Sequence, residues 1–389
     1  MASDESDGTS RLEDTQRHVL TTRGAPVVPL GIWIAATAVV LATCALSGRS
    51  PFRTATWSHW DSYLYLDIAR HGYTAFHCPG AAARIWCGNA GWFPAYPWLV
   101  RGLGGIGFSQ VGAALVLSWL AGVGALVLLW ATFLRRRIGA AVMLALFYAS
   151  FAPGQVYMYA VDPISLLVFC TIAYLWFLDR ERWLAAGLTG AVLVLVYPTG
   201  GVPPAVAAGW LLVAYRRSSW PERLRRVALA VGPAIASIGF LFIFMQLTLG
   251  HWDAYFRVER KYGHGPHDPL SPTFHAIETL ADPTPFRVDN AVAFQTLLVT
   301  VVLVCVIAHA VRQGRAVGRT EAMLVLWAIA AWAVPATANP ASIYRAQAAL
   351  LPVAVLVGRL PRFLAAGLIV AAVAVSIPLE LMFLRNLLE

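Results

Sequence analysis

The chain is predicted to be an all-α polytopic membrane protein, and three observations lead to that class. Hydrophobic residues make up 59% of the 389 residues, only 13% are charged, and the mean hydropathy is +0.64. Apolar runs of membrane-spanning length recur along almost the whole sequence. Arginines gather in the short links between the runs rather than inside them. This composition excludes a soluble domain.

The apolar runs give about eleven candidate membrane helices, since a helix crosses the hydrocarbon in about 20 residues. Several of them are short and contain proline or glycine, which membrane helices tolerate when neighbours satisfy the freed backbone groups. We find no tandem repeat, so residues 27–389 are predicted to form one domain. The candidate spans are 27–46, 109–134, 139–153, 163–178, 183–197, 200–215, 226–249, 291–311, 321–337, 344–358 and 363–384.

The first 26 residues are polar and of mixed charge, and we expect residues 1–26 to form a disordered cytoplasmic tail. This segment is too long and too acidic for the start of a signal peptide, and no convincing cleavage site follows the first apolar run. We therefore interpret 27–46 as a retained membrane anchor.

Arginine placement predicts the orientation in a plasma (cytoplasmic) membrane. Under the positive-inside rule the basic links are cytoplasmic, which places the N-terminus inside and the C-terminus outside. Loops 47–108 and 250–290 are then extracytoplasmic. Counting the apolar segment 92–106 as a span would move every later arginine link outside, so we predict a re-entrant or surface-lying helix there. The basic links hold Arg135 to Arg137, Arg180 and Arg182, Arg216 to Arg226, Arg312 to Arg319, and Arg359 with Arg362.

The first outer loop begins with a charged, aromatic patch, WSHWDSYLYLDIARHGY, from Trp57 to Tyr73. Apolar residues recur there at helical spacing, which predicts an amphipathic surface helix over 57–71. Asp61 and Tyr65 lie one turn apart beside the apolar stripe. The patch is either an interfacial anchor or a site that handles a polar group at the membrane surface.

Three other positions carry competing interpretations. Asp67 precedes Arg70 and His71 by three and four residues, which favours a local helical ion pair. Asp162 precedes Pro163 and is either a helix N-cap or a substrate contact. Arg345 lies beside Tyr344 at the start of a span. An arginine inside a membrane is energetically unfavourable unless it is paired with an anion or hydrated, so Arg345 either extends to the membrane surface or has a functional role.

The second outer loop holds a group of basic and histidine side chains. They can hold a lipid phosphate, or they belong to a solvated loop with scattered ion pairs. The residues are His251, Arg257, Arg260 and Lys261.

Cysteine placement and missing motifs limit the cofactors. Cys78 and Cys87 both lie in the first outer loop, where oxidation is permitted, so a disulfide between them is possible. We find no nucleotide-binding motif, and no dense carboxylate cluster of the kind that a hard cation needs, so no cofactor and no metal is predicted. Because the arginines separate apolar runs, they indicate topology and membrane-lipid contacts, and no nucleic-acid partner is predicted.

WDSYLYLDIARHGY followed by WFPAYPWLVR resembles the signature of PIG-V-type (GPI mannosyltransferase II-like) mannosyltransferases, which belong to the GT-C glycosyltransferases. Weaker matches are YAVDP at 159–163, YPTG at 197–200, GHWDAYF at 250–256 and SIYRAQAALLP at 342–352. The chain departs from the family pattern at Tyr197, where an arginine is common, and in the order of Tyr344 and Arg345. The residues that match the main signature are Trp60, Asp61, Tyr65, Ile68, Ala69, Gly72, Tyr73, Phe93, Pro94, Tyr96 and Pro97.

The resemblance implies a GT-C-type bundle that transfers a sugar, usually mannose, with inversion from a polyprenyl phosphate to a lipid-linked or glycan acceptor. The arginine-rich, lysine-poor composition suggests a bacterial source. The family's catalytic aspartate corresponds to Asp61, as the base that inverting transfer needs. The alternatives are another polyprenyl-phosphate sugar, a transporter, or a non-catalytic membrane partner. The expected substrate contacts are Trp60, Ser62, Tyr65, His71, Tyr73, Phe93, Asp162, His251, Arg257, Arg260, Lys261, Tyr344 and Arg345.

Overall fold

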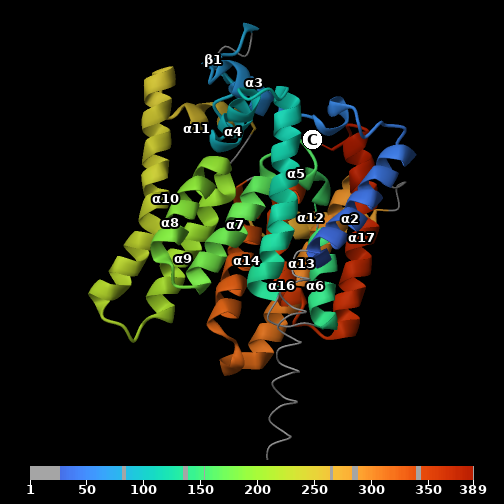
Figure 1. Ribbon diagram of the computed structural model, residues 1–389, viewed down its shortest axis with the longest axis vertical. Coiled ribbons are helices and arrows are strands. Elements are labelled where there is room, and N and C mark those ends of the chain that lie inside the picture. Colours follow the sequence, from blue (N-terminus) through green and yellow to red (C-terminus); the bar gives the residue numbers. More distant parts are fainter. Residues whose placement is uncertain are drawn as a thin grey trace, which may run out of the picture.

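Long apolar helices stand side by side and form the body of the protein (Figure 1). The computed structural model describes residues 27–80, 85–134, 139–152, 154–262, 266–282, 288–338 and 343–388. The predicted cytoplasmic tail, residues 1–26, lies outside the described residues.

Six helices in the described part of the chain are long and apolar enough to cross a membrane. The chain is therefore an integral membrane protein of the all-α class. Every predicted span coincides with a helix, but several of these helices are short, so the number of spans stays a prediction. The six are α2 (Val27–Leu46), α5 (Gln110–Leu129), α10 (Trp220–Leu249), α13 (Val288–Gln313), α14 (Arg319–Ala338) and α17 (Arg362–Leu384).

The shorter apolar helices fill the space between the long ones. Small residues let their backbones approach closely, which is the usual basis of helix packing in membranes. A Cβ placed at Gly187 of α8 would collide with the backbone of Leu229 in α10, and one at Gly190 would crowd Tyr174 of α7. The shorter helices are α6 (Ala140–Ser150), α7 (Ile164–Asp179), α8 (Trp183–Val196), α9 (Val202–Ala214), and the series α15 (Ile343–Ala346), η9 (Gln347–Val353) and α16 (Ala354–Val357).

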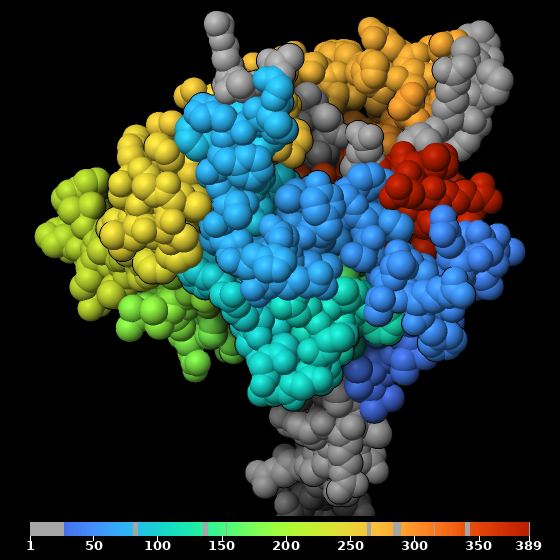
Figure 2. All heavy atoms as spheres, turned by 90° about the horizontal axis from the view of Figure 1, so that it is seen from above, coloured from blue at the N-terminus to red at the C-terminus, as the bar shows by residue number. Residues whose placement is uncertain are grey.

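Short elements cover one end of the bundle, which we call the α3 end. Here α3 (Ser62–His71), α4 (Ala95–Gly104) and α11 (Ala254–Glu259) lie together, opposite the α9–α10 and α13–α14 links (Figure 1). Seen from above, residues 50–100 lie between α10 and the C-terminal segment, with α12 (Ser271–Ala281) beyond them (Figure 2). The α3 end is therefore built from both predicted outer loops.

The amphipathic helix of the first loop is shorter than the predicted 57–71. It begins at Ser62, whereas Trp57 ends a separate 3₁₀ turn, η1 (Thr54–Trp57). The break lies at Trp60, whose φ of 42° is left-handed and interrupts a continuous right-handed helix. The segment predicted as re-entrant or surface-lying, 92–106, contains α4, whose ten residues are too few to cross a bilayer.

A small hairpin in the first loop adds a two-stranded sheet that the all-α prediction did not include. Strands β1 (Ala75–His77) and β2 (Trp86–Gly88) pair antiparallel, with Phe76 opposite Cys87. Cys78 and Cys87 are joined by a disulfide bond. The Asn89 side chain accepts a hydrogen bond from the Thr74 amide and donates to Asp67, which ties the hairpin to α3.

Candidate active site

Asp61 and Arg345 form an ion pair at the α3 end, although 284 residues separate them in the sequence. Asp61 lies at the N-cap of α3, and Arg345 lies in α15. The side chain of Arg345 is 11% exposed and that of Asp61 is 27% exposed. Arg345 therefore turns inward to a carboxylate instead of reaching to the membrane surface.

The ion pair lines a cleft with a cavity volume of about 210 Å³. Helices from the first and last thirds of the chain form parts of its wall, and α11 closes another side. The cleft combines an anion, a cation, phenol groups and apolar surface, which is the mixture expected of a site for a polar ligand. The lining residues are Asp61, Tyr65, Gly91, Trp92, Tyr197, Pro198, Thr199, Tyr255, Glu259, Tyr262, Pro335, Ala338, Arg345 and Ala346.

The backbone before α3 is held so that Asp61 faces this cleft. The Ser62 hydroxyl donates to the Val161 carbonyl, and its oxygen accepts from the His59 amide. The buried Trp57 is fixed in the same way, because its indole N–H donates to the Pro51 carbonyl. The left-handed φ of Trp60 is a strained value for an aromatic residue, and it immediately precedes the acidic side chain.

Arg345 is held by contacts along α15. The side-chain amide of Gln295 donates to the Tyr344 carbonyl and to the Gln347 side chain. The Arg345 guanidinium carbon lies 5.9 Å from the centre of the Tyr157 ring. Gln295 of α13 therefore holds the helix that carries Arg345, while Tyr157, from the segment before α7, lies beside its side chain.

Glu259 is the cleft residue that the sequence did not indicate. It ends α11 and is partly buried beside Gly91, where a Cβ would collide with the glutamate oxygen Oε1. Burial, and next the negative charge of Asp61, raise the pKa of Glu259 to about 8, against the opposing effect of Lys261 and Arg345. Glu259 belongs to the same loop as the predicted cations, but nothing in the sequence around it indicates that it packs against Gly91.

Three predicted residues line the cleft: Asp61, Tyr65 and Arg345. Asp162 is buried nearby, 5% exposed, and is not among the cleft residues in the described part of the chain. Its carboxylate accepts a hydrogen bond from the Ile164 amide, and Pro163 between them has helical φ and ψ. Asp162 therefore caps α7 with Pro163 in the first helical position, as one of its two predicted roles required. Burial raises the pKa of Asp162 to about 7, although Arg345 acts in the opposite direction.

The predicted cations of the second loop lie outside the cleft as the described residues define it. Arg257 pairs with Asp253 at 2.7 Å, lowering the pKa of that carboxyl, and covers the Trp86 ring of the hairpin. The ring of His251 also packs against Trp86. Lys261 lies over the Tyr262 ring at 4.7 Å, and Arg260 is exposed.

The remaining predicted contacts have packing partners of their own. His71 pairs with Asp67 at 2.8 Å on the exposed side of α3, as the spacing predicted. The Tyr73 hydroxyl donates to the Trp92 carbonyl. Trp60 packs against Phe383 and Phe93 against Tyr255, while Ser62 makes the hydrogen bonds given above. A substrate contact by any of these residues stays a prediction.

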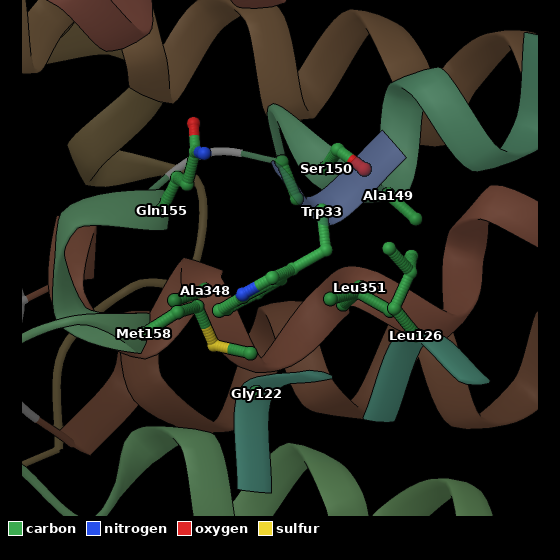
Figure 3. Close-up of a pocket in the computed structure, with 10 residues that line it drawn as sticks. Trp33, Gly122, Leu126, Ala149, Ser150, Gln155, Met158, Ala348 and Leu351 are labelled. Atoms are coloured by element: carbon green, nitrogen blue, oxygen red, sulfur yellow. The ribbon is translucent and has the colours of Figure 1, made fainter. Parts of the chain in front are cut away.

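Two further cavities differ in character. One, of about 470 Å³, lies between α12, α13 and the C-terminal segment and includes Tyr344, the residue before Arg345. The other is an interior void of about 10 Å³, room for one water, with the Trp33 indole lying across it (Figure 3). Among the residues that line this void none ionises, so it is a packing defect and not a site.

Within the described residues no group of three or more His, Cys, Asp or Glu side chains is placed to hold a metal ion. The paired Asp61 and Arg345 offer a proton acceptor next to a fixed positive charge.

No family model and no curated protein matches the chain. Among solved structures it is similar to the Archaeoglobus fulgidus oligosaccharyltransferase tethered with an acceptor peptide containing the NVT sequon, with a TM-score of 0.51 and 15% identity over 92% of this chain and 55% of that one. A second similar structure is archaeal oligosaccharyltransferase AglB from Archaeoglobus fulgidus in complex with an inhibitory peptide and a dolichol-phosphate, with a TM-score of 0.51, 14% identity and coverage of 92% and 56%. At this identity the likeness shows the fold alone, which the chain shares with these oligosaccharyltransferases, and the chain spans about half the length of these proteins.

Proposed function

We propose that the protein is an inverting glycosyltransferase that transfers mannose from polyprenyl-phosphate-mannose to a lipid-linked or glycan acceptor. The observation that carries this proposal is the part-buried Asp61–Arg345 pair in a cleft at one end of a GT-C-like fold. The choice of mannose rests on the WDSYLYLDIARHGY signature, which includes Asp61.

Asp61 is the general base in this proposal. The acceptor hydroxyl attacks C1 of the donor sugar from the face opposite the phosphate, and its proton passes to the Asp61 carboxylate. The bond between C1 and the phosphate oxygen breaks, and the polyprenyl phosphate leaves with the bonding electrons. A positioned base of this kind contributes about 10² to 10⁴ in rate.

Arg345 stabilises the leaving phosphate. Its guanidinium is already part-buried beside the Tyr157 ring, on a helix that Gln295 holds through the Tyr344 carbonyl, so a positive charge is in place where negative charge develops on the phosphate. Because the attack comes from the face opposite the phosphate, the donor sugar has to lie between Asp61 and Arg345, and donor binding separates their ion pair. One similar structure contains a dolichol-phosphate, which supports a lipid phosphate as the leaving group.

A transferase has to bind a donor and an acceptor, each of which needs its own way to the reacting atoms. Two cavities meet at neighbouring residues, one lined by Tyr344 and the other by Arg345. We assign the Arg345 cleft to the donor and the Tyr344 cavity to the acceptor. The arginine-rich links lie at the opposite end of the bundle, so the positive-inside rule supports an extracytoplasmic position for both.

The test is transfer of radiolabelled mannose from polyprenyl-phosphate-mannose in membranes that contain wild type or Asp61→Asn at equal protein level. We expect label in a lipid or glycan fraction with wild type and a loss of about 10² or more with the variant. Asp268→Asn is the matched control, because Asp268 is an exposed aspartate of the second loop.

Equal transfer by wild type and Asp61→Asn would remove Asp61 from the mechanism. A panel of polyprenyl-phosphate hexoses and pentoses decides the sugar. Folded wild-type protein that transfers none of them to a broad acceptor extract would refute the glycosyltransferase proposal and favour a transporter or a non-catalytic partner.

A further inference from the structure

Glu259 occupies a place in the cleft wall that is shaped for its carboxyl group. The side chain ends α11 and packs against Gly91, where any larger residue would meet its oxygen Oε1. Asp61 and Arg345 line the same cleft. A second acidic group thus stands beside the proposed base and the proposed phosphate-binding cation.

A second carboxylate would oppose the binding of an anionic donor. Two negative charges in a partly buried site repel each other and repel a phosphate. Burial and the charge of Asp61 raise the pKa of Glu259 to about 8, so the carboxyl is mainly neutral at pH 7. The ionisable groups that line the cleft around it or act on it are Asp61, Tyr65, Tyr197, Tyr255, Lys261, Tyr262 and Arg345.

Protonation of Glu259 removes the excess negative charge of the cleft. With Glu259 neutral, the charges of Asp61 and Arg345 balance within the cleft, and Lys261 acts on Glu259 from outside it. A sugar linked to a lipid through one phosphate carries one negative charge. Enzymes elsewhere use a carboxylic acid kept neutral at pH 7 as a hydrogen-bond donor, so this role has a physical precedent.

We propose that Glu259 meets the donor as a neutral carboxylic acid and donates a hydrogen bond to its anionic phosphate. Loss of the Glu259 proton replaces that hydrogen bond by charge repulsion and releases the donor. No bond is made or broken at Glu259, and its proton stays on the carboxyl during transfer. This inference rests on the proposed function and adds a donor-binding residue and a pH limit to it.

The experiment measures kcat and the KM for the donor between about pH 6 and pH 9.5 for wild type, Glu259→Gln and Glu259→Ala. For wild type we expect KM to rise about tenfold per pH unit above about pH 8. Glu259→Gln should keep the low KM and lose this rise, since an amide donates a hydrogen bond and does not ionise. Glu259→Ala should raise KM by about tenfold or more at every pH.

Glu278→Gln is the matched control, because Glu278 is a 79% exposed glutamate of α12, and it should keep the wild-type profile. A Glu259→Gln enzyme with the wild-type rise in KM, or with a KM as high as that of Glu259→Ala at pH 7, would overturn the inference. A structural role alone would not remove the alkaline rise selectively.

Gly91→Ala tests the role of the Glu259 carboxyl by displacing it without replacing it. This variant is the alternative experiment if Glu259→Gln does not fold. The added methyl group displaces the end of a flexible side chain, so the protein should fold while donor KM rises at pH 7. Gly91→Ala should not raise the donor KM further in a protein that already carries Glu259→Ala. If Gly91→Ala raises KM equally with and without Glu259→Ala, the contact between Gly91 and Glu259 does not matter for donor binding. If transfer depends on Asp61 but none of these Glu259 effects is found, this inference is wrong and the proposed function stands. If the wild-type protein transfers no sugar, both the proposed function and this inference are wrong.

Discussion

Two ion pairs at opposite ends of the helical bundle lie in very different surroundings. At the α3 end, Asp61 and Arg345 come from remote segments, and the arginine side chain is 11% exposed. At the opposite end, Arg225 lies three residues from Glu222, and its side chain is 66% exposed. Exposed local pairs contribute little, whereas a buried pair is strongly coupled. A remote, partly buried pair also occurs at the opposite end, between Arg359 and Glu321, so the position in the cleft is what distinguishes the pair of Asp61 and Arg345.

The largest expected effect comes from breaking the remote pair. Arg345→Gln leaves Asp61 without its cation in a confined site and should destabilise the fold by about 3–5 kcal/mol. Denaturation of the purified protein in detergent measures this loss. Asp61→Asn combined with Arg345→Gln should recover part of it, because no unpaired charge remains, and a purely additive double variant would contradict strong coupling between the two side chains.

A smaller effect is expected at Asp162, the buried carboxyl near this pair. Its folded-state pKa of about 7 lies above the ordinary value of 3.8, so the folded state holds a proton that the unfolded state has lost. Stability should therefore fall as pH rises from about 4 to about 7, by a few kcal/mol in total. Melting curves across this window should show less pH dependence for Asp162→Asn than for wild type; the same slope in both would exclude Asp162 as the source.

The hairpin at the α3 end should respond to loss of its cross-link. Replacing Cys78 and Cys87 by serine removes the constraint on a short loop, worth about 2–3 kcal/mol in hairpin stability. Hydrogen exchange at β1 and β2 should accelerate while exchange in α5 and α13 stays unchanged. Faster exchange throughout the bundle would mean that the hairpin supports the whole fold.

The smallest effect is expected at the opposite end. Glu222→Gln removes the partner of Arg225 and Arg226, which are helical neighbours in a solvated link. We expect the melting temperature and transfer rate to remain at wild-type values. A marked loss of either would show that the two ends are less different than their burial suggests.

Local patterns predicted most of the fold. Apolar run length gave the position of every helix in the body, because span length is set by bilayer thickness. The i to i+4 spacing of Asp67 and His71 likewise predicted their pairing. The same spacing relates Asp253 and Arg257, and it indicates their ion pair. Ion pairing within the loop was one of the two interpretations of these cations, and binding of a lipid phosphate was the other.

Non-local features of the site could not be obtained in this way. The pairing of Asp61 with Arg345 depends on how helices from both ends of the chain pack, and no periodicity encodes that. Glu259 gains its position from Gly91, 168 positions earlier in the numbering, and Tyr197 enters the cleft where the resembling family commonly has arginine. Sequence indicated Asp61 and Arg345 separately, and the fold brings them together.

The length of α10 has a consequence for the membrane around the protein. Its 30 residues extend about 45 Å, but its first two turns carry Glu222, Arg223, Arg225 and Arg226, which leaves residues 227–249, about 35 Å, for the roughly 30 Å hydrocarbon layer. The tilt of a membrane helix is set by its packing against neighbours, and α10 packs along α8. Because residues 250–253 alone separate α10 from α11, the depth at which α10 ends in the bilayer fixes the position of the cleft wall that carries Glu259.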